Sequence, residues 1–240
     1  KLLLAAFDIS VGSYVAEIGG VVAEVLDPST ALRMTTSCHS ERSTLTMYGA
    51  PTTYGAPDIY GTESLALPSW DELWSLAEEG EGGDVRCPDA DAAERMREAI
   101  DAARQAGDSL GGVFVVAATG VPVGLGSHVH WERRLDARLA AAVMSIPAIK
   151  GVAIGPAFQN ARRPGTQVHD GFCREHLNMD EIRRGRLGAV KGWARTSNRA
   201  GGIEGGMSNG MPVVVRAAMK PIPTTLTPLP SVDLATGEPA

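Results

Sequence analysis

The chain alternates between short apolar runs with strand character and longer segments with helical spacing. Side chains of residues 13–18 alternate between two faces, which is the pattern of a β-strand. A pair of glycines follows and ends this strand. Residues 113–118 form a continuous apolar run, which indicates a strand buried on both faces. Residues 213–219 form a further apolar strand. Both later strands follow glycine-rich turns, at 107–112 and 200–210, and lead into Pro/Gly exits, so we predict a pseudo-repeated α+β core.

Two helices are predicted between the first and second strands. Ser69 has the side chain of an N-cap, and Glu72 completes a capping box three residues later. Pro88 opens the second helix and Gly107 ends it. Apolar residues recur along this second helix at helical spacing and form one stripe: Ala93, Met96, Ile100 and Ala103.

The second half of the chain begins with a third helix. It is predicted over residues 133–146, and Pro147 ends it before a short strand at 150–154. Residues 159–186 are polar, irregular and rich in arginine. They are interpreted as a solvated face or, alternatively, as a loop that holds phosphate. Five prolines make residues 221–240 extended and loop-like.

Residues 27–67 interrupt the alternation of strands and helices. Three near-copies of a six-residue unit begin at Tyr48, Tyr54 and Tyr60, and Ser, Thr, Gly and Pro dominate the segment. This composition favours a flexible surface insertion. The alternative is a tyrosine-rich arm that packs on a neighbouring subunit.

Composition narrows the class of protein. A hydrophobic content of 44% over 240 residues permits a substantial core. The net charge of −6 argues against a general nucleic-acid or membrane-surface binder, and no apolar run has transmembrane length. The three cysteines lack metal-ligand spacing, which predicts reduced thiols in a cytosolic protein and no metal site. Because the first residue is Lys, we expect the sequence to begin inside a longer chain.

The clearest candidate chemistry lies between Arg195 and Thr224. Consecutive N–H groups in the glycine turn at 200–210 are able to form an anion-binding nest. Lys220 ends the following strand and adds a mobile charge suited to phosphate. The alternative is a tight hairpin whose glycines only satisfy turn geometry.

Seven blocks of sequence, in order, resemble chorismate synthase. Together they cover most of the chain outside residues 27–67. The blocks are Gly-Asp-Ser-Leu-Gly-Gly-Val from residue 107, Gly-Val-Pro-Val-Gly-Leu-Gly from 120, Leu-Asp-Ala-Arg-Leu-Ala from 135, Met-Ser-Ile-Pro-Ala-Ile-Lys-Gly-Val from 144, Ser-Asn-Arg-Ala-Gly-Gly-Ile-Glu-Gly-Gly-Met-Ser-Asn-Gly from 197, Val-Arg-Ala-Ala-Met-Lys-Pro-Ile-Pro-Thr from 215 and Ser-Val-Asp-Leu-Ala-Thr-Gly from 231.

The resemblance implies a fold, a reaction and an assembly. The fold is an α+β layered β-α-α-β sandwich with helices packed between sheets, assembled as a homotetramer. The reaction is the FMN-dependent 1,4-anti elimination of phosphate from 5-enolpyruvylshikimate 3-phosphate, a step of the cytoplasmic shikimate pathway that gives chorismate. The cofactor is reduced FMN. NADPH is the expected reductant, with the reductase either built in or supplied by another protein.

The resemblance also assigns cofactor contacts to particular residues of this chain. Pro147 and Ala148 become flavin contacts at the helix-to-strand turn, and Gly205 becomes a close backbone approach to the flavin. The segment that holds the FMN phosphate consists of Lys220, Pro221, Ile222, Pro223 and Thr224, with Lys220 as the charge and Thr224 as a hydroxyl donor. Asn198 and Arg199 are further pocket candidates.

Several motifs of the family do not occur in this sequence. They include a histidine in a Gly-Glu-Ser-His-Gly-type turn, a second histidine, an Arg-Ser-Ser flavin motif and a late Arg-x-Asp-x-Cys motif with the catalytic aspartate. No catalytic residue is therefore assigned, and we interpret residues 1–240 as an internal fragment with little turnover alone. The alternatives are a non-catalytic flavin-binding or assembly module that pairs with a complete subunit, and a generic phosphate-ligand binder.

Overall fold

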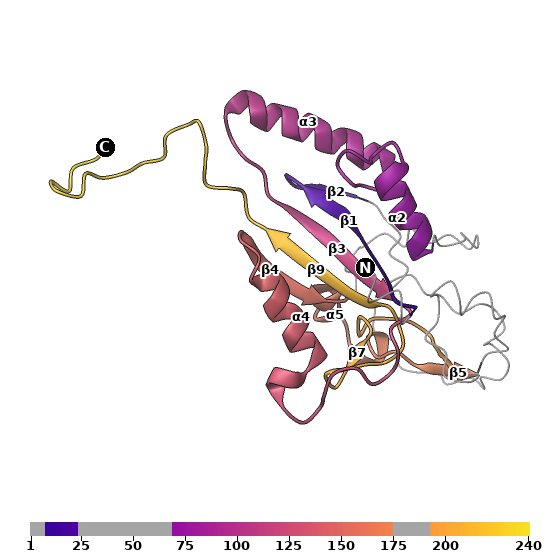
Figure 1. The fold of residues 1–240 in the computed structure, drawn as a ribbon. Coiled ribbons are helices and arrows are strands. Elements are labelled where there is room, and N and C mark those ends of the chain that lie inside the picture. Colours follow the sequence, from indigo (N-terminus) through magenta and orange to yellow (C-terminus); the bar gives the residue numbers. More distant parts are fainter. Residues whose placement is uncertain (1–7, 24–68, 175–192) are drawn as a thin grey trace, which may run out of the picture.

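The computed structural model describes residues 8–23, 69–174 and 193–240 (Figure 1). The predicted helix end at 1–7, the predicted insertion at 27–67 and residues 175–186 of the arginine-rich stretch lie outside these residues. The main sheet has five antiparallel strands in the order β2-β1-β3-β9-β4. They are β1 (Ser10–Ile18), β2 (Val21–Val22), β3 (Gly112–Thr119), β4 (Ile149–Ile154) and β9 (Val213–Met219).

Burial along β3 corrects one expectation. Val115 and Ala117 are buried, whereas Phe114 and Val116 are only half-buried. One face of the strand is therefore fully covered and the other is not. The cause is that β3 pairs antiparallel with β1 and β9, and antiparallel sheets, unlike parallel ones, tolerate one solvated face.

Helix α2 (Trp70–Glu79) begins at the predicted capping box. The Ser69 hydroxyl accepts from the Glu72 backbone N–H at 3.2 Å, and the Ser69 N–H donates to the Glu72 carboxylate at 2.5 Å. The reciprocal bonds satisfy two backbone donors that a helix start leaves free. The buried face of α2 packs against one side of the sheet: Trp70, Leu73 and Ala77 meet Tyr14, Val115, Ala117 and Val214.

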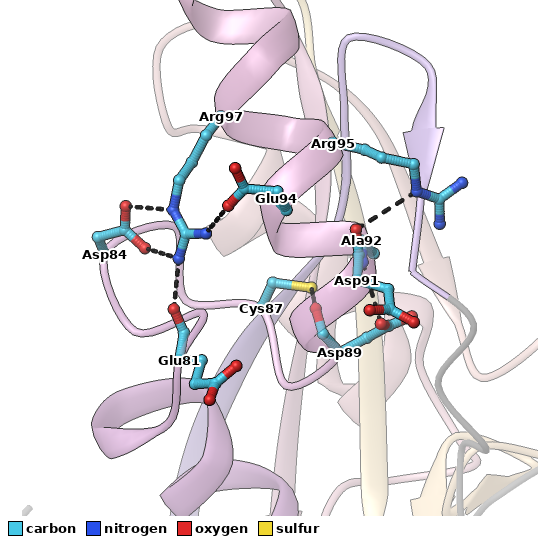
Figure 2. A network of polar contacts seen from close by, with 9 residues as sticks. All are labelled: Glu81, Asp84, Cys87, Asp89, Asp91, Ala92, Glu94, Arg95 and Arg97. Carbon is cyan, nitrogen blue, oxygen red and sulfur yellow. Dashed lines mark hydrogen bonds and ion pairs between the residues drawn. The ribbon is translucent and has the colours of Figure 1, made fainter.

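Helix α3 (Ala90–Ala106) begins two residues later than Pro88 because Asp89 is its N-cap and accepts from the Ala92 N–H at 3.0 Å. It ends at Gly107, which adopts the left-handed conformation at φ 67°. Arg97, in the middle of α3, ties this helix to the preceding link: its guanidinium donates to both Asp84 carboxylate oxygens at 2.9 Å and to the Glu81 carbonyl (Figure 2).

The link between α2 and α3 contacts the part of β1 that its short neighbour β2 leaves unpaired. The Val15 N–H donates to the Arg86 carbonyl at 2.9 Å, and the Arg86 guanidinium donates to the Ser13 carbonyl at 3.3 Å. Tyr14 packs on α2, while Val15 packs on the α3 cluster, and adjacent strand residues point to opposite faces. The two helices therefore cover opposite faces of β1, and the link satisfies edge groups that would otherwise be unpaired.

Helix α4 (Leu135–Met144) follows a 3-10 turn, η2 (Trp131–Arg133), so it starts later than predicted. Leu135 and Leu139 pack against Val213 and Ile154 of the sheet. The stretch expected to be irregular contains short elements instead: α5 (Ala157–Asn160), a 3-10 turn η3 (Gly165–Gln167) and β5 (Phe172–Arg174). Strand β5 pairs with β6 (Trp193–Arg195), and β7 (Ile203–Glu204) pairs with β8 (Met207–Ser208).

The described residues thus form a mixed α+β structure with one large antiparallel sheet and two small ribbons. The finer layering, with helices between two large sheets, stays a prediction. No helix in the described ranges is long and apolar enough to cross a membrane.

Candidate functional site

Three segments distant in sequence meet where β9 ends. Met219, the last residue of β9, pairs with Gly112 at the start of β3 and with Ile149 at the start of β4. The Lys220 N–H donates to the Ala148 carbonyl at 2.9 Å. Antiparallel pairing of β9 with both neighbouring strands therefore places the Pro147–Ala148 turn beside Lys220.

The turn before β4 has an unusual backbone. Ala148 has φ 69°, one of three positive values among the described non-glycine residues. Alanine rarely occupies this left-handed region, because its Cβ crowds the backbone at a cost of roughly 1 kcal/mol. Pro147 is exposed and Ala148 half-buried. Strain of this kind clusters at ligand-contacting turns.

The segment 220–224 is exposed but anchored to the glycine turn before β3. The Ser109 hydroxyl donates to the Ile222 carbonyl at 2.6 Å, and the Leu226 N–H donates to the Gly107 carbonyl at 2.8 Å. A Cβ at Gly111 would lie 2.5 Å from the Met219 carbonyl oxygen, so only glycine permits this approach. The glycines of residues 107–112 thus serve close chain packing.

Lys220 and Thr224 have polar groups free for a ligand. Within the described ranges, Lys220 takes part in no ion pair. Both residues are exposed on a segment whose backbone accepts a hydrogen bond from Ser109 at Ile222. An ammonium and a hydroxyl on an anchored strand exit suit a phosphate group.

The glycine-rich turn lies at the other end of β9. Gly205 and Gly206 have φ of 59° and 89° and connect β7 to β8 in the manner of a type I′ hairpin, which requires two positive φ values. Gly205 is exposed, and a Cβ there would meet nothing within 4 Å. Gly205 is therefore required by the hairpin and is also open to a ligand.

Asp170, which the sequence pattern did not single out, holds the start of this turn. Its carboxylate accepts from the Arg199 N–H at 2.8 Å, the Ala200 N–H at 2.9 Å and the Ser197 hydroxyl. Asn198 is fully buried between these residues and bridges the turn to β9. Its amide donates to the Pro212 carbonyl and accepts from the Gly202 N–H, both at 2.8 Å. Asn198 is thus a structural residue.

Charged side chains fix the hairpin from outside. Arg195 forms two hydrogen bonds with Glu204, at 3.1 and 2.5 Å, and stacks over Phe172 at 4.3 Å from the ring centre.

Burial lowers the pKa of Arg199, and the nearby Arg163 lowers it further. One terminal nitrogen of Arg199 is buried without a hydrogen-bond partner.

The structure therefore divides the predicted cofactor contacts into two groups. Pro147, Ala148 and residues 220–224 meet at the end of β9, whereas the glycine turn joins the start of β9 through the Val214 N–H and the Gly201 carbonyl. Seven strand residues separate the groups by roughly 20 Å. Figure 1 shows β7 and the exit of β9 at opposite ends of the sheet.

Comparison with known proteins covers the whole chain. The family model for chorismate synthase matches residues 1–240. The chain belongs to the chorismate synthase family. A chorismate synthase from Geobacter sulfurreducens is 46% identical over 239 residues, which is 100% of this chain and 48% of the relative. One from Moorella thermoacetica is 53% identical over 167 residues, covering 70% of this chain and 40% of the relative.

A solved structure agrees with the family assignment. A crystal structure of chorismate synthase superimposes with a TM-score of 0.64 at 38% identity, over 92% of this chain and 52% of that one. The resemblance read from the seven blocks is confirmed. The chain spans about half the length of the curated chorismate synthases that it matches.

Proposed function

We propose that this chain is part of a chorismate synthase, a lyase that eliminates phosphate from 5-enolpyruvylshikimate 3-phosphate with reduced FMN. The observation that carries the proposal is the family match over all 240 residues, with relatives 45–54% identical. The meeting of the Pro147–Ala148 turn with segment 220–224 supports a cofactor site within it. The homotetramer, the reductant NADPH and the cytoplasmic location belong to the same proposal.

In this proposal the chain's contribution is to bind and orient the cofactor. Reduced FMN supplies transient electron density and a proton acceptor when bound. Lys220 and Thr224 hold its phosphate, because they present a charge and a hydroxyl donor from an anchored backbone. Pro147 and Ala148 line the ring side, on a turn whose left-handed Ala148 fixes the direction of the chain. Gly205 offers a separate backbone contact at the other end of β9.

Anaerobic titration of reduced FMN into wild-type chain and variants tests the phosphate contact. Lys220→Ala should weaken binding about 10- to 100-fold, since a hydrogen bond to a charged group contributes roughly 1.5–3 kcal/mol. Thr224→Ala should weaken it less. Arg95→Ala serves as the control, because Arg95 is exposed near the start of α3, away from residues 107–111. Equal affinity of wild type and Lys220→Ala would show that the phosphate lies elsewhere.

A second candidate function is a flavin-binding or assembly module that pairs with a complete subunit. The observation behind this candidate is that the chain matches only 48% of the length of the Geobacter sulfurreducens relative. Chorismate formation is followed by absorbance under anaerobic conditions with reduced FMN, alone and with a full-length family member added. FMN binding and a stable mixed oligomer, without turnover of its own, would favour the module. Full turnover by this chain alone would exclude the module and contradict the expected low activity.

A further inference from the structure

The tip of the β7–β8 hairpin is exposed, yet neighbouring segments hold the hairpin in place. Gly205 lies at the tip, and a Cβ there would meet nothing within 4 Å. On the β8 side, the Ser208 hydroxyl accepts from the Leu125 N–H at 2.8 Å. The Gly206 carbonyl accepts from the Leu135 N–H, also at 2.8 Å. A ribbon with so few paired residues is not stable by itself, so the position of the tip depends on contacts from outside the hairpin.

On the β7 side, the hairpin is held by Arg195, which belongs to β6. Its guanidinium donates to both carboxylate oxygens of Glu204, at 3.1 and 2.5 Å, and Glu204 is the residue before Gly205. The same guanidinium donates to the Asp170 carbonyl at 3.4 Å and stacks over the Phe172 ring. The Arg195 side chain is only 11% exposed. Its orientation is therefore fixed by partners outside the hairpin, and the two bonds to Glu204 hold the strand that carries the tip.

Asp170 connects two parts of the glycine-rich segment. Its carboxylate accepts from the N–H groups of Arg199 and Ala200, where the segment begins. Its carbonyl accepts from Arg195, which binds Glu204 further along the chain. The start of the turn and the strand before its tip are therefore held against the same residue.

We propose that Arg195 is a positioning residue for the cofactor: it holds the hairpin so that the Gly205 backbone meets the flavin. This inference rests on the proposed function, which makes Gly205 a backbone contact of reduced FMN. A backbone that is already held in place binds more tightly than a mobile one, because less conformational freedom is lost on binding. Arg195 touches no part of the cofactor in this role and acts through Glu204.

The shape of the guanidinium separates this role from that of an ordinary ion pair. An exposed ion pair contributes little to stability. A planar guanidinium binds two carboxylate oxygens in a defined geometry, whereas the ammonium of lysine is a point charge on a flexible chain. Arg195→Lys therefore keeps the charge and removes the defined geometry. Glu204→Gln, which keeps the length of the partner and removes its charge, is a second variant that tests the same pair.

Two flavins separate the hairpin contact from the phosphate contact. Reduced FMN and reduced riboflavin, which lacks the phosphate, are titrated anaerobically into wild-type chain, Arg195→Lys, Glu204→Gln and Lys220→Ala. Gly205 and Lys220 lie at opposite ends of β9, so the hairpin contacts a part of the flavin other than its phosphate. Arg195→Lys and Glu204→Gln should each weaken the binding of both flavins by the same factor, about 3- to 10-fold. Lys220→Ala should weaken the binding of FMN alone.

Arg97→Lys is the matched control, since the Arg97 guanidinium also binds both oxygens of a carboxylate, that of Asp84, but does so on α3. Urea unfolding measures the stability of each variant. Arg97→Lys should lower the urea midpoint, while its affinities for both flavins stay within about twofold of wild type. The double variant Arg195→Lys with Glu204→Gln should bind no more weakly than the weaker single variant, because both changes act on the same pair.

Wild-type affinity for both flavins in Arg195→Lys would overturn the proposal, as would a loss confined to FMN. An equal loss of affinity in Arg97→Lys would also overturn it, because that result indicates general destabilisation. A wild-type chain that binds neither flavin would refute the proposed function together with this role of Arg195. Unchanged FMN binding by Lys220→Ala would refute the phosphate contact alone, and riboflavin would still decide the role of Arg195.

Discussion

Replacing Asn198 with alanine should strongly destabilise the chain near the glycine turn. Asn198 has no exposed surface, and its amide joins the Pro212 carbonyl to the Gly202 N–H, both at 2.8 Å. Truncation leaves both backbone groups buried without partners. Water does not reach them, because Gly202 and Pro212 are themselves buried.

The magnitude follows from those two groups. A buried donor or acceptor that loses its partner costs about 1–3 kcal/mol, so the pair costs roughly 2–6 kcal/mol. Typical domains have a free energy of unfolding of about 5–15 kcal/mol, so Asn198→Ala should remove a large share of it. Asn198→Asp should recover only part, because an ionised aspartate can accept from Gly202 but cannot donate to the Pro212 carbonyl.

Urea unfolding followed by far-UV circular dichroism measures the loss. Asn160→Ala is the matched control, since Asn160 donates one bond, to the Arg199 carbonyl at 2.8 Å, and is only half-buried. That variant should lose about 1 kcal/mol. A free energy of unfolding for Asn198→Ala within 1 kcal/mol of wild type would refute the assignment of Asn198 as a bridge between the turn and β9.

Two further predictions concern packing and pH. Gly12→Ala should lower the free energy of unfolding by about 1–3 kcal/mol, because its Cβ would lie 2.2 Å from the Trp74 ring. Gly151→Ala is its control: a Cβ there lies 3.5 Å from Ala218, so thermal melts should change little, and equal losses in both variants would contradict the clash. Arg134 holds the pKa of Asp136 below its usual range, so this carboxylate stabilises the fold above about pH 4 and the stabilisation is lost as the pH falls further. Asp136→Asn should therefore be less stable than wild type at pH 6, with a gap in urea midpoint that narrows by pH 3; a constant gap would count against the ion pair.

Local features of this fold could be predicted from the sequence because their partners lie close in the chain. The capping box joins Ser69 and Glu72, three residues apart, and Gly107 ends α3 through its own backbone conformation. The strand at 213–219 has the predicted bounds, since its apolar run is uninterrupted. The family could likewise be predicted from the sequence, because each of the seven blocks that resemble it is a continuous stretch of residues.

Only the tertiary structure decided which distant residues meet. Asp170 binds the turn 27–30 residues further on, and an aspartate in an arginine-rich stretch carries no local sign of that role. The resemblance placed Gly205 and Lys220 at one cofactor, but the extended length of β9 puts them at opposite ends of the sheet. The stripe of α3 indicated a buried helix, yet Ile100 of that stripe is exposed, whereas Ala93 and Met96 are buried. Periodicity specifies which face of an element is apolar, whereas what covers that face depends on contacts between segments far apart in sequence.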